Sequence, residues 1–214
     1  MRRTECATTD NGQHTTDLLC YIAHMTDKIT NAIYSIGHGN RSIETFMELI
    51  HEFRIEHLAD VRSYPSSRRN PHFDRKNLEL TLNKSAISYS WFPDLGGFRR
   101  EGLGKTSPHV ALNSPGFRNY ADYMNTTSFL AAASKLGHLV TSGSACFMCA
   151  EVLPHRCHRS LLSDYLLVQG FKVIHILDNR KTITHELSRL ASLSEGRIIY
   201  NRTDLQQMEL KQHD

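Results

Sequence analysis

Residues 145–167 read ACFMCAEVLPHRCHRSLLSDYLL, and they combine an apolar run, a polar loop and a helical pattern. The apolar run over 145–150 is typical of a buried strand, and the apolar spacing over 160–170 is typical of a helix. Pro154 stands just upstream of the expected helix start near Cys157 or His158. A strand that leads through a loop into a helix is half of a βαβ unit, so the question is whether the rest of the chain repeats it.

The same alternation recurs along the chain. Buried strands are predicted at 32–37, 56–61, 87–92, 145–150 and 172–177. Helices are predicted at 41–53, 74–85, 117–124, 128–136, 160–170 and 183–193. Ser42 is the expected N-cap of the first helix, and Asp74 opens the second. This order predicts an α/β fold with three layers: a mostly parallel five-stranded sheet, helices on both faces, and a Rossmann-like topology.

Length and composition fit one globular domain. The 214 residues are 40% hydrophobic and 22% charged, which is an ordinary globular composition. We expect a poorly ordered N-terminal extension over 1–28, a single α/β domain over 29–195 and a C-terminal tail over 196–214. The formal charge of +3 permits an anionic partner without requiring one.

The cysteine content indicates a reducing compartment. The chain has five cysteines, an odd number, and no apolar leader segment precedes them. No stretch is long and apolar enough to span a bilayer. We therefore expect a cytoplasmic protein with no membrane partner, whose cysteines are thiols or ligands rather than disulfides.

Chemically versatile residues follow the ends of the predicted strands. In open parallel sheets, ligands bind at the carboxyl ends of the strands, so these residues are predicted to share one site. Glycines allow a ligand to approach the backbone, and the planar fork of arginine suits phosphate or carboxylate. The candidates for substrate binding are Gly37, His38, Asp60, Arg62, Arg99, Arg156 and Arg159. An ordinary tight turn and a solvated basic loop are the alternatives.

The loop before the helix at 160–170 holds the candidates for catalysis. Cys157 stands at the helix start, where free amides and the helix dipole favour negative charge. With a histidine and two arginines beside it, a lowered pKa is expected for Cys157, which makes it a candidate nucleophile. Glu151 is a candidate general acid or base. The catalytic candidates are Glu151, Cys157 and His158, and the alternative is a small buried cysteine next to a surface turn.

The cysteines also raise the possibility of a metal site. Cys146 and Cys149 are three residues apart, so on a strand they point to opposite faces and cannot chelate one ion together. A site built from Cys149, Cys157, His158 and a distant histidine has suitable ligand types for zinc. No metal is assigned from the sequence, and these three residues are retained as weak candidates for ligands.

The order of motifs resembles the domain of unknown function 488 family. The motifs are a Gly-His turn, an Asp-Val-Arg strand end, and Cys-x-Glu followed by Cys-His-Arg, and the similarity extends over about 32–187. The motif residues of that family would correspond to Gly37, His38, Asp60, Arg62, Pro65, Cys149, Glu151, Cys157, His158 and Arg159. Gly39 stands where the family usually has serine. The family name implies no settled activity and no cofactor.

Three functions are compatible with these residues. The first hypothesis is an enzyme, a transferase or hydrolase, that acts on a phosphorylated or nucleotide-like substrate. The second is a nucleic-acid-binding accessory module, although +3 is a weak charge for binding phosphate backbones. The third is a metal- or redox-sensing protein that uses its Cys and His residues. The sequence determines neither the cofactor nor the oligomeric state.

Overall fold

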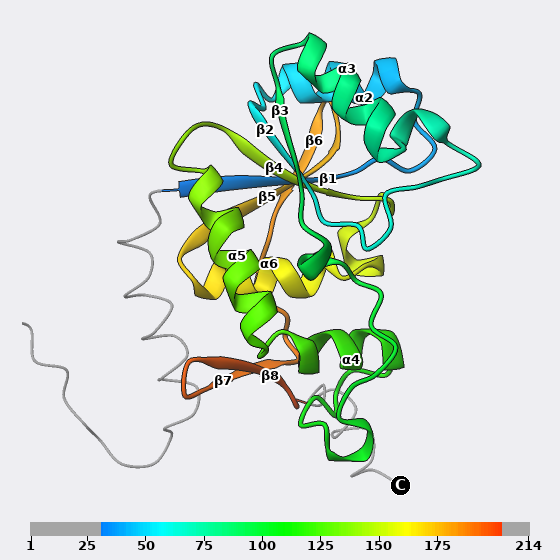
Figure 1. Cartoon of the computed structure of the whole chain (residues 1–214). Coiled ribbons are helices and arrows are strands. Elements are labelled where there is room, and N and C mark those ends of the chain that lie inside the picture. Colours follow the sequence, from blue (N-terminus) through cyan, green and yellow to red (C-terminus); the bar gives the residue numbers. More distant parts are fainter. Residues whose placement is uncertain (1–30, 203–214) are drawn as a thin grey trace, which may run out of the picture.

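The computed structural model describes residues 31–202, and the expected extension over 1–28 lies outside the described residues. The central sheet has six strands in the order β3-β2-β4-β1-β5-β6 (Figure 1). Its strands are β1 Asn31–Gly37, β2 His57–Asp60, β3 Ser88–Trp91, β4 Ala145–Cys149, β5 Phe171–Asp178 and β6 Lys181–Thr184. The first five are the predicted strands and run parallel, and β6 pairs antiparallel with β5. The predicted α/β class and mostly parallel sheet are confirmed.

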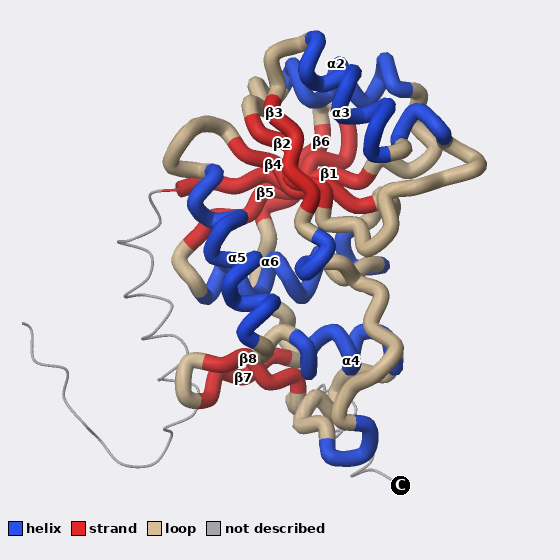
Figure 2. The backbone as a smooth tube through the Cα atoms, in the orientation of Figure 1, coloured by secondary structure: helices blue, strands red, loops and turns tan. Residues whose placement is uncertain are grey.

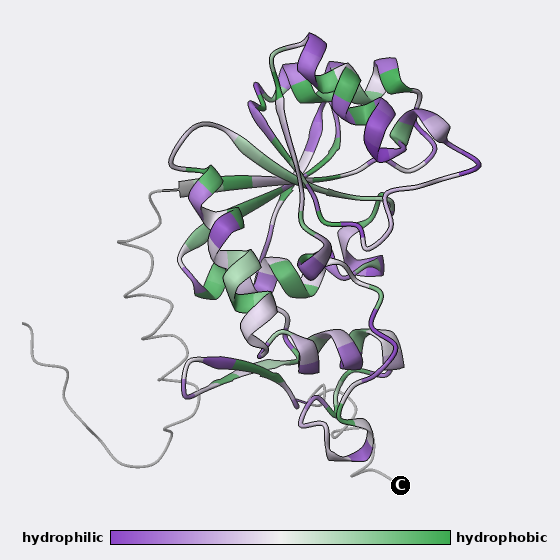
Figure 3. Cartoon of the chain, in the orientation of Figure 1, coloured by the Kyte–Doolittle hydropathy of each residue, from purple (hydrophilic) through white to green (hydrophobic). Residues whose placement is uncertain are grey.

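Helices cover both faces of this sheet. They are α2 Ile43–Glu52, α3 Arg75–Lys84, α4 Pro115–Tyr123, α5 Thr127–Leu139 and α6 Arg159–Val168. Figure 2 shows α2 and α3 together above the sheet and α5 and α6 below it. Two separate apolar clusters fill the spaces between the layers. In Figure 3 the helices carry both hydrophobic and hydrophilic colours, as expected where one side packs on a sheet and the other faces solvent.

Local sequence accounts for the first helix. The Ser42 hydroxyl accepts a hydrogen bond from the backbone N–H of Thr45 at 3.2 Å, so the expected N-cap is present. The buried positions of α2 are Phe46, Met47, Leu49 and Ile50. Their helical spacing places them on one stripe against the sheet.

Strand β4 separates the two faces of the sheet, as its alternation predicts. Cys146 and Met148 belong to the apolar cluster beneath α2 and α3. Cys149 and Phe147 belong to the cluster on the α5 and α6 side. Cys146 and Cys149 therefore point to opposite faces, and the exclusion of a metal site that uses both is confirmed.

The predicted helix over 183–193 is wrong. The chain instead forms β6, and then a hairpin of β7 Ala191–Ser194 and β8 Arg197–Tyr200. Glu195 and Gly196 both have positive φ in its turn, as a two-residue hairpin with a type I′ turn requires. Long-range bonds fix the segment before this hairpin: the His185 ring contacts the His175 ring at 3.0 Å and the Asp164 carboxylate at 2.9 Å. These contacts override the helical spacing.

Part of the expected C-terminal tail is packed into the structure. Tyr200, in β8, is buried, and its hydroxyl donates to the Asp164 carboxylate at 2.8 Å. Its carbonyl accepts from the N–H of Ala111 at 2.9 Å. Residues 203–214 of that tail lie outside the described residues. Over residues 31–202, no helix combines the length and apolar character needed to cross a membrane.

Gly37 should be essential for the meeting of β1 and β4. A Cβ atom at this position would overlap the carbonyl group of Glu151, which is backbone and cannot rotate away. Gly37→Ala should lower the free energy of unfolding by about 3 kcal/mol or more, measured by urea denaturation. The matched control is Gly116→Ala in α4, where the nearest atom would be 3.8 Å away; this change should be neutral or slightly stabilising. Equal stability of the two variants would contradict the close approach.

Candidate functional site

The carboxyl ends of β1 and β4 are joined beyond the last paired residues of the strands. The N–H of His38 donates to the carbonyl of Cys149 at 3.0 Å, and the N–H of Gly39 donates to that of Ala150 at 2.8 Å. These two amides are therefore occupied by the sheet. Gly37 serves the close approach of the two chain segments.

Asp60 fixes the guanidinium of Arg62 at the end of β2. One Asp60 oxygen accepts from the Arg62 backbone N–H at 3.0 Å and from Nε at 2.8 Å. The other oxygen pairs with Arg62 Nη2 and accepts from the Tyr89 hydroxyl at 2.8 Å. Arg62 Nη2 also donates to the carbonyl of Phe73 at 2.8 Å. The pair is buried, so the arginine is held rigidly and only Nη1 is left to face another group.

His38 is held as a neutral imidazole next to Arg62. Its ring stacks on Phe73 with centroids 4.2 Å apart, and its Nδ1 lies 2.9 Å from the carbonyl of Gly39. Since only a protonated Nδ1 can donate to that carbonyl, Nε2 is the acceptor that faces Arg62 Nη1 at 3.3 Å. Burial and the nearby Arg62 charge lower the pKa of His38 to about 4. His38 Nε2 therefore takes one hydrogen of Arg62 Nη1, and the second hydrogen of Nη1 remains for a ligand.

A polar hollow of about 490 Å³ opens at this edge. It is lined by residues from the turn after β1, the loop after β2 and the turn after β4: His38, Gly39, Asn40, Arg62, Tyr64, Ser66, Ser67, Arg69, Asn70, Ala150, Glu151 and Val152. Glu151 is half-buried, and its carboxylate accepts from the N–H of Leu153 at 3.3 Å. Of the predicted residues, His38, Arg62 and Glu151 line the hollow. The loop residues 64–70 carry no periodic signal, and only their arginines and hydroxyls after a strand marked them.

Arg159 lies beneath the site. Its side chain is 1% exposed. It donates from Nη1 to Ser35 at 3.0 Å, from Nη2 to the carbonyls of Glu151 and Val152, and from Nε to the Cys157 sulfur at 3.2 Å. With every nitrogen engaged, this guanidinium holds the turn after β4 in place and positions Glu151.

The two remaining predicted arginines lie away from the hollow. Arg156 is exposed on the short turn Pro154–Arg156. Arg99 packs over the ring of Tyr123, 3.6 Å from its centroid, and donates to the carbonyl of Asp94 at 2.9 Å. The structure therefore brings together His38, Arg62 and Glu151, with Gly37, Asp60 and Arg159 supporting them, and it leaves Arg99 and Arg156 outside.

A buried group of two cysteines and a histidine lies behind the hollow. The ligand atoms of Cys149, Cys157 and His158 all lie within 4.8 Å of one another. His158 Nε2 contacts the carbonyl of Val61 at 3.0 Å, and its Nδ1 lies 3.9 Å from the Cys149 sulfur. These residues are the weak metal candidates of the sequence, and two of them are also its catalytic candidates.

The low pKa expected for Cys157 belongs to Cys149 instead. Hydrogen bonding from the Cys157 thiol, and then from backbone amides of the following turn, lowers the pKa of Cys149 to about 6. The pKa of Cys157 rises to about 12 because its thiol donates to Cys149 and is buried. The N–H and Nε of Arg159 also donate to the Cys157 sulfur, at 3.4 and 3.2 Å. Both sulfurs thus accept hydrogen bonds, and the two thiols share a proton and titrate as a pair.

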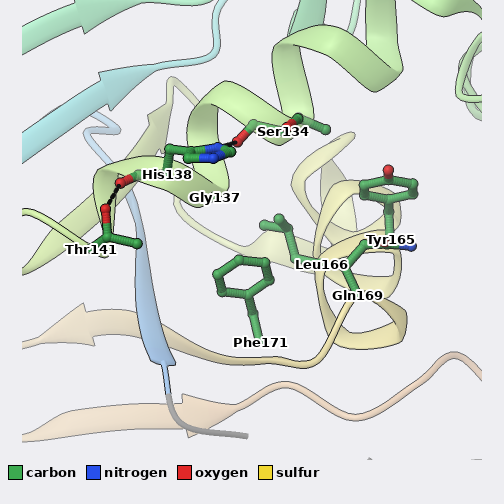
Figure 4. Close-up of a pocket in the computed structure, with 9 residues that line it drawn as sticks. Ser134, Gly137, His138, Thr141, Tyr165, Leu166, Gln169 and Phe171 are labelled. Atoms are coloured by element: carbon green, nitrogen blue, oxygen red, sulfur yellow. Dashed lines mark hydrogen bonds between the residues drawn. The ribbon is translucent and has the colours of Figure 1, made fainter. Parts of the chain in front are cut away.

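A second cavity, of about 290 Å³, lies between α5 and α6, near the first residue of β5 (Figure 4). Its walls include Gly137, Leu166 and Phe171. The one imidazole there, His138, contacts the carbonyl of Ser134 at 2.7 Å. This cavity lacks the arginine, carboxylate and thiol groups of the carboxyl edge, so the candidate site is the hollow.

Fold and site together define an α/β protein with a polar hollow at the carboxyl edge of a parallel sheet and a buried Cys-Cys-His group behind it. The model of the family called "Domain of unknown function DUF488" matches residues 42–166, more than half of the chain, and this chain belongs to that family. The resemblance found in the sequence is confirmed. No curated protein and no solved structure matches the chain.

Arg159 should act on stability, since its donors are all engaged. Arg159→Gln should lower the free energy of unfolding by about 3 kcal/mol or more, because several buried acceptors lose their donor. The exposed Arg156, three residues earlier, supplies the control: Arg156→Gln should change stability by less than about 0.5 kcal/mol. Urea denaturation of the two variants measures the difference. A full-stability Arg159→Gln protein would show that the guanidinium does not hold the turn.

Proposed function

We propose that this chain is an enzyme, a transferase or hydrolase, that binds a phosphorylated or nucleotide-like small molecule in the hollow. The observation that carries the proposal is the prearranged Arg62. Because Asp60 and the Phe73 carbonyl already fix its guanidinium, binding an anion through Nη1 immobilises little further side-chain freedom. Planar, fixed guanidinium groups are well suited to phosphate oxygens.

The loop after β2 supplies the rest of an anion site. Arg69 is exposed and lines the hollow together with Ser66, Ser67 and Asn70. Asp60 compensates the charge of Arg62, so Arg69 is the exposed cation of the hollow and Glu151 is its carboxylate. The serine hydroxyls and the amide of Asn70 are additional donors for phosphate oxygens.

An exposed aromatic pair supports a ligand with a planar ring. Tyr64 lines the hollow and is 72% exposed. Its ring meets that of Phe98 edge-on at 6.0 Å, and the Arg100 guanidinium lies 5.6 Å from the Phe98 ring. Exposed aromatic rings and guanidinium planes are the surfaces on which bases stack. A nucleotide-like ligand could place its phosphate at Arg69 and its ring at Tyr64.

Glu151 is the carboxylate of the hollow and is proposed as the group that transfers a proton. Cys157 and His158, the other catalytic candidates, are buried behind it and remain predictions. The cytoplasm remains the expected compartment, because Cys146, Cys149 and Cys157 are free thiols. The nucleic-acid-binding module is the second hypothesis, since Arg68 and Arg69 are both exposed on one loop.

A thermal-shift screen of mononucleotides, sugar phosphates, inorganic phosphate and short oligonucleotides tests the proposal. A small ligand at 100 times its dissociation constant should stabilise the wild type by about 2.7 kcal/mol. Arg69→Gln should weaken that ligand about tenfold, through loss of a charge-assisted bond, while the exposed Arg156→Gln outside the hollow should bind it normally. Glu151→Gln should still bind the same ligand but should no longer convert it to product. Chromatography of the reaction mixture measures this conversion.

Other results would count against the enzyme. If only oligonucleotides raise the melting temperature, and if this effect depends steeply on salt, the nucleic-acid-binding module replaces the enzyme as the preferred hypothesis. If no phosphorylated compound stabilises the wild type, or if Arg69→Gln and Arg156→Gln bind equally, the hollow is not an anion site.

A further inference from the structure

The group of Cys149, Cys157 and His158 has the composition and position of a metal centre. Cys149 ends β4, while Cys157 and His158 stand immediately before α6. The strand and the helix are both packed in the core, and the turn residues Cys157 and His158 are themselves buried. The three side chains are 7–9% exposed, and thiolate and imidazole are the ligands that a borderline-soft divalent ion prefers.

The distances require only a small adjustment. Bond lengths of about 2.3 Å to sulfur and about 2.0–2.1 Å to nitrogen place two ligands of a tetrahedral zinc ion about 3.6–3.8 Å apart. The His158 nitrogen and the Cys149 sulfur are 3.9 Å apart. All three ligand atoms lie within 4.8 Å of one another. The ligand atoms therefore need to move by about one ångström or less to reach the separations of a tetrahedral site.

The surrounding contacts orient the ligands. His158 Nε2 donates to the Val61 carbonyl at 3.0 Å, so Nδ1 is unprotonated. The lone pair of Nδ1 lies on the side of the cysteines. A histidine that binds metal through one nitrogen typically donates from the other to a carbonyl or carboxylate. Arg159 donates twice to the Cys157 sulfur and is itself fixed by Ser35. Such bonds to a thiolate stabilise it as a ligand.

We propose that Cys149, Cys157 and His158 bind one zinc-class divalent ion. Three protein ligands leave the fourth position of a tetrahedral ion for water or another small ligand, which is the arrangement of catalytic rather than structural zinc sites. The proposal is independent of the anion site, because it uses none of the side chains that line the hollow.

The test uses the full chain with Cys6→Ser and Cys20→Ser in every protein, so that only three thiols remain. The reduced, metal-free protein is titrated with Zn²⁺ in competition with a chromophoric chelator. One equivalent should bind, and Zn²⁺ should raise the melting temperature. Substituted Co²⁺ should give a thiolate-to-cobalt charge-transfer band with the intensity of two thiolates.

Cys149→Ser, Cys157→Ser and His158→Gln should each weaken Zn²⁺ binding at least tenfold. The matched control is Cys146→Ser, which removes a buried thiol from the opposite face of β4 and should leave Zn²⁺ binding unchanged.

If a ligand variant fails to fold, the Co²⁺ band of the parent protein still decides the number of thiolates. Absence of stoichiometric Zn²⁺ binding, or a loss in Cys146→Ser as large as in the others, would overturn the proposal. So would a Cys149–Cys157 disulfide that forms under conditions in which Zn²⁺ does not bind. None of these outcomes depends on Arg69, so they are separate from the test of the hollow.

Discussion

One buried guanidinium joins β1, the turn after β4 and the segment before α6, and so supports the hollow on the side of Glu151. Arg159 reaches Ser35 within β1, the carbonyls of the turn after β4, and the Cys157 sulfur before α6. A buried charge is tolerated only when its donors are paired, so this turn cannot open without leaving a charge unsatisfied. The position of Glu151 in the hollow and that of Cys157 in the cysteine group consequently depend on the same side chain.

Much of the fold was predictable because the strands are short apolar runs that end in polar residues. That pattern placed β1 to β5, and the alternation of β4 assigned Cys146 and Cys149 to different faces. The helix that was predicted over 183–193 is absent for a specific reason. Its apolar spacing is helical, but His185 bonds to His175 and Asp164, and these partners lie on elements that no local pattern can bring near.

The meeting of the candidate residues was predictable, but their individual contacts were not. The rule for parallel sheets predicts that they share one edge, and His38, Arg62 and Glu151 do meet there. The role of Arg159 was not predictable, because an arginine at a helix start has the same local sequence whether it faces solvent or is buried. Here the difference is made by Ser35, 124 residues away. In the same way, Cys149 and not Cys157 has the lowered pKa because the two thiols share one proton across the loop.

The charge balance of the hollow restricts what it can recognise. Asp60 neutralises Arg62 and both are buried, so a ligand gains little from the net charge of this pair. What the pair offers is a fixed donor: His38 Nε2 accepts one hydrogen of Arg62 Nη1 at 3.3 Å, and the second hydrogen remains for a ligand. The pair therefore gives the hollow a directional contact without net charge, while the exposed Arg69 supplies attraction that is common to all anions.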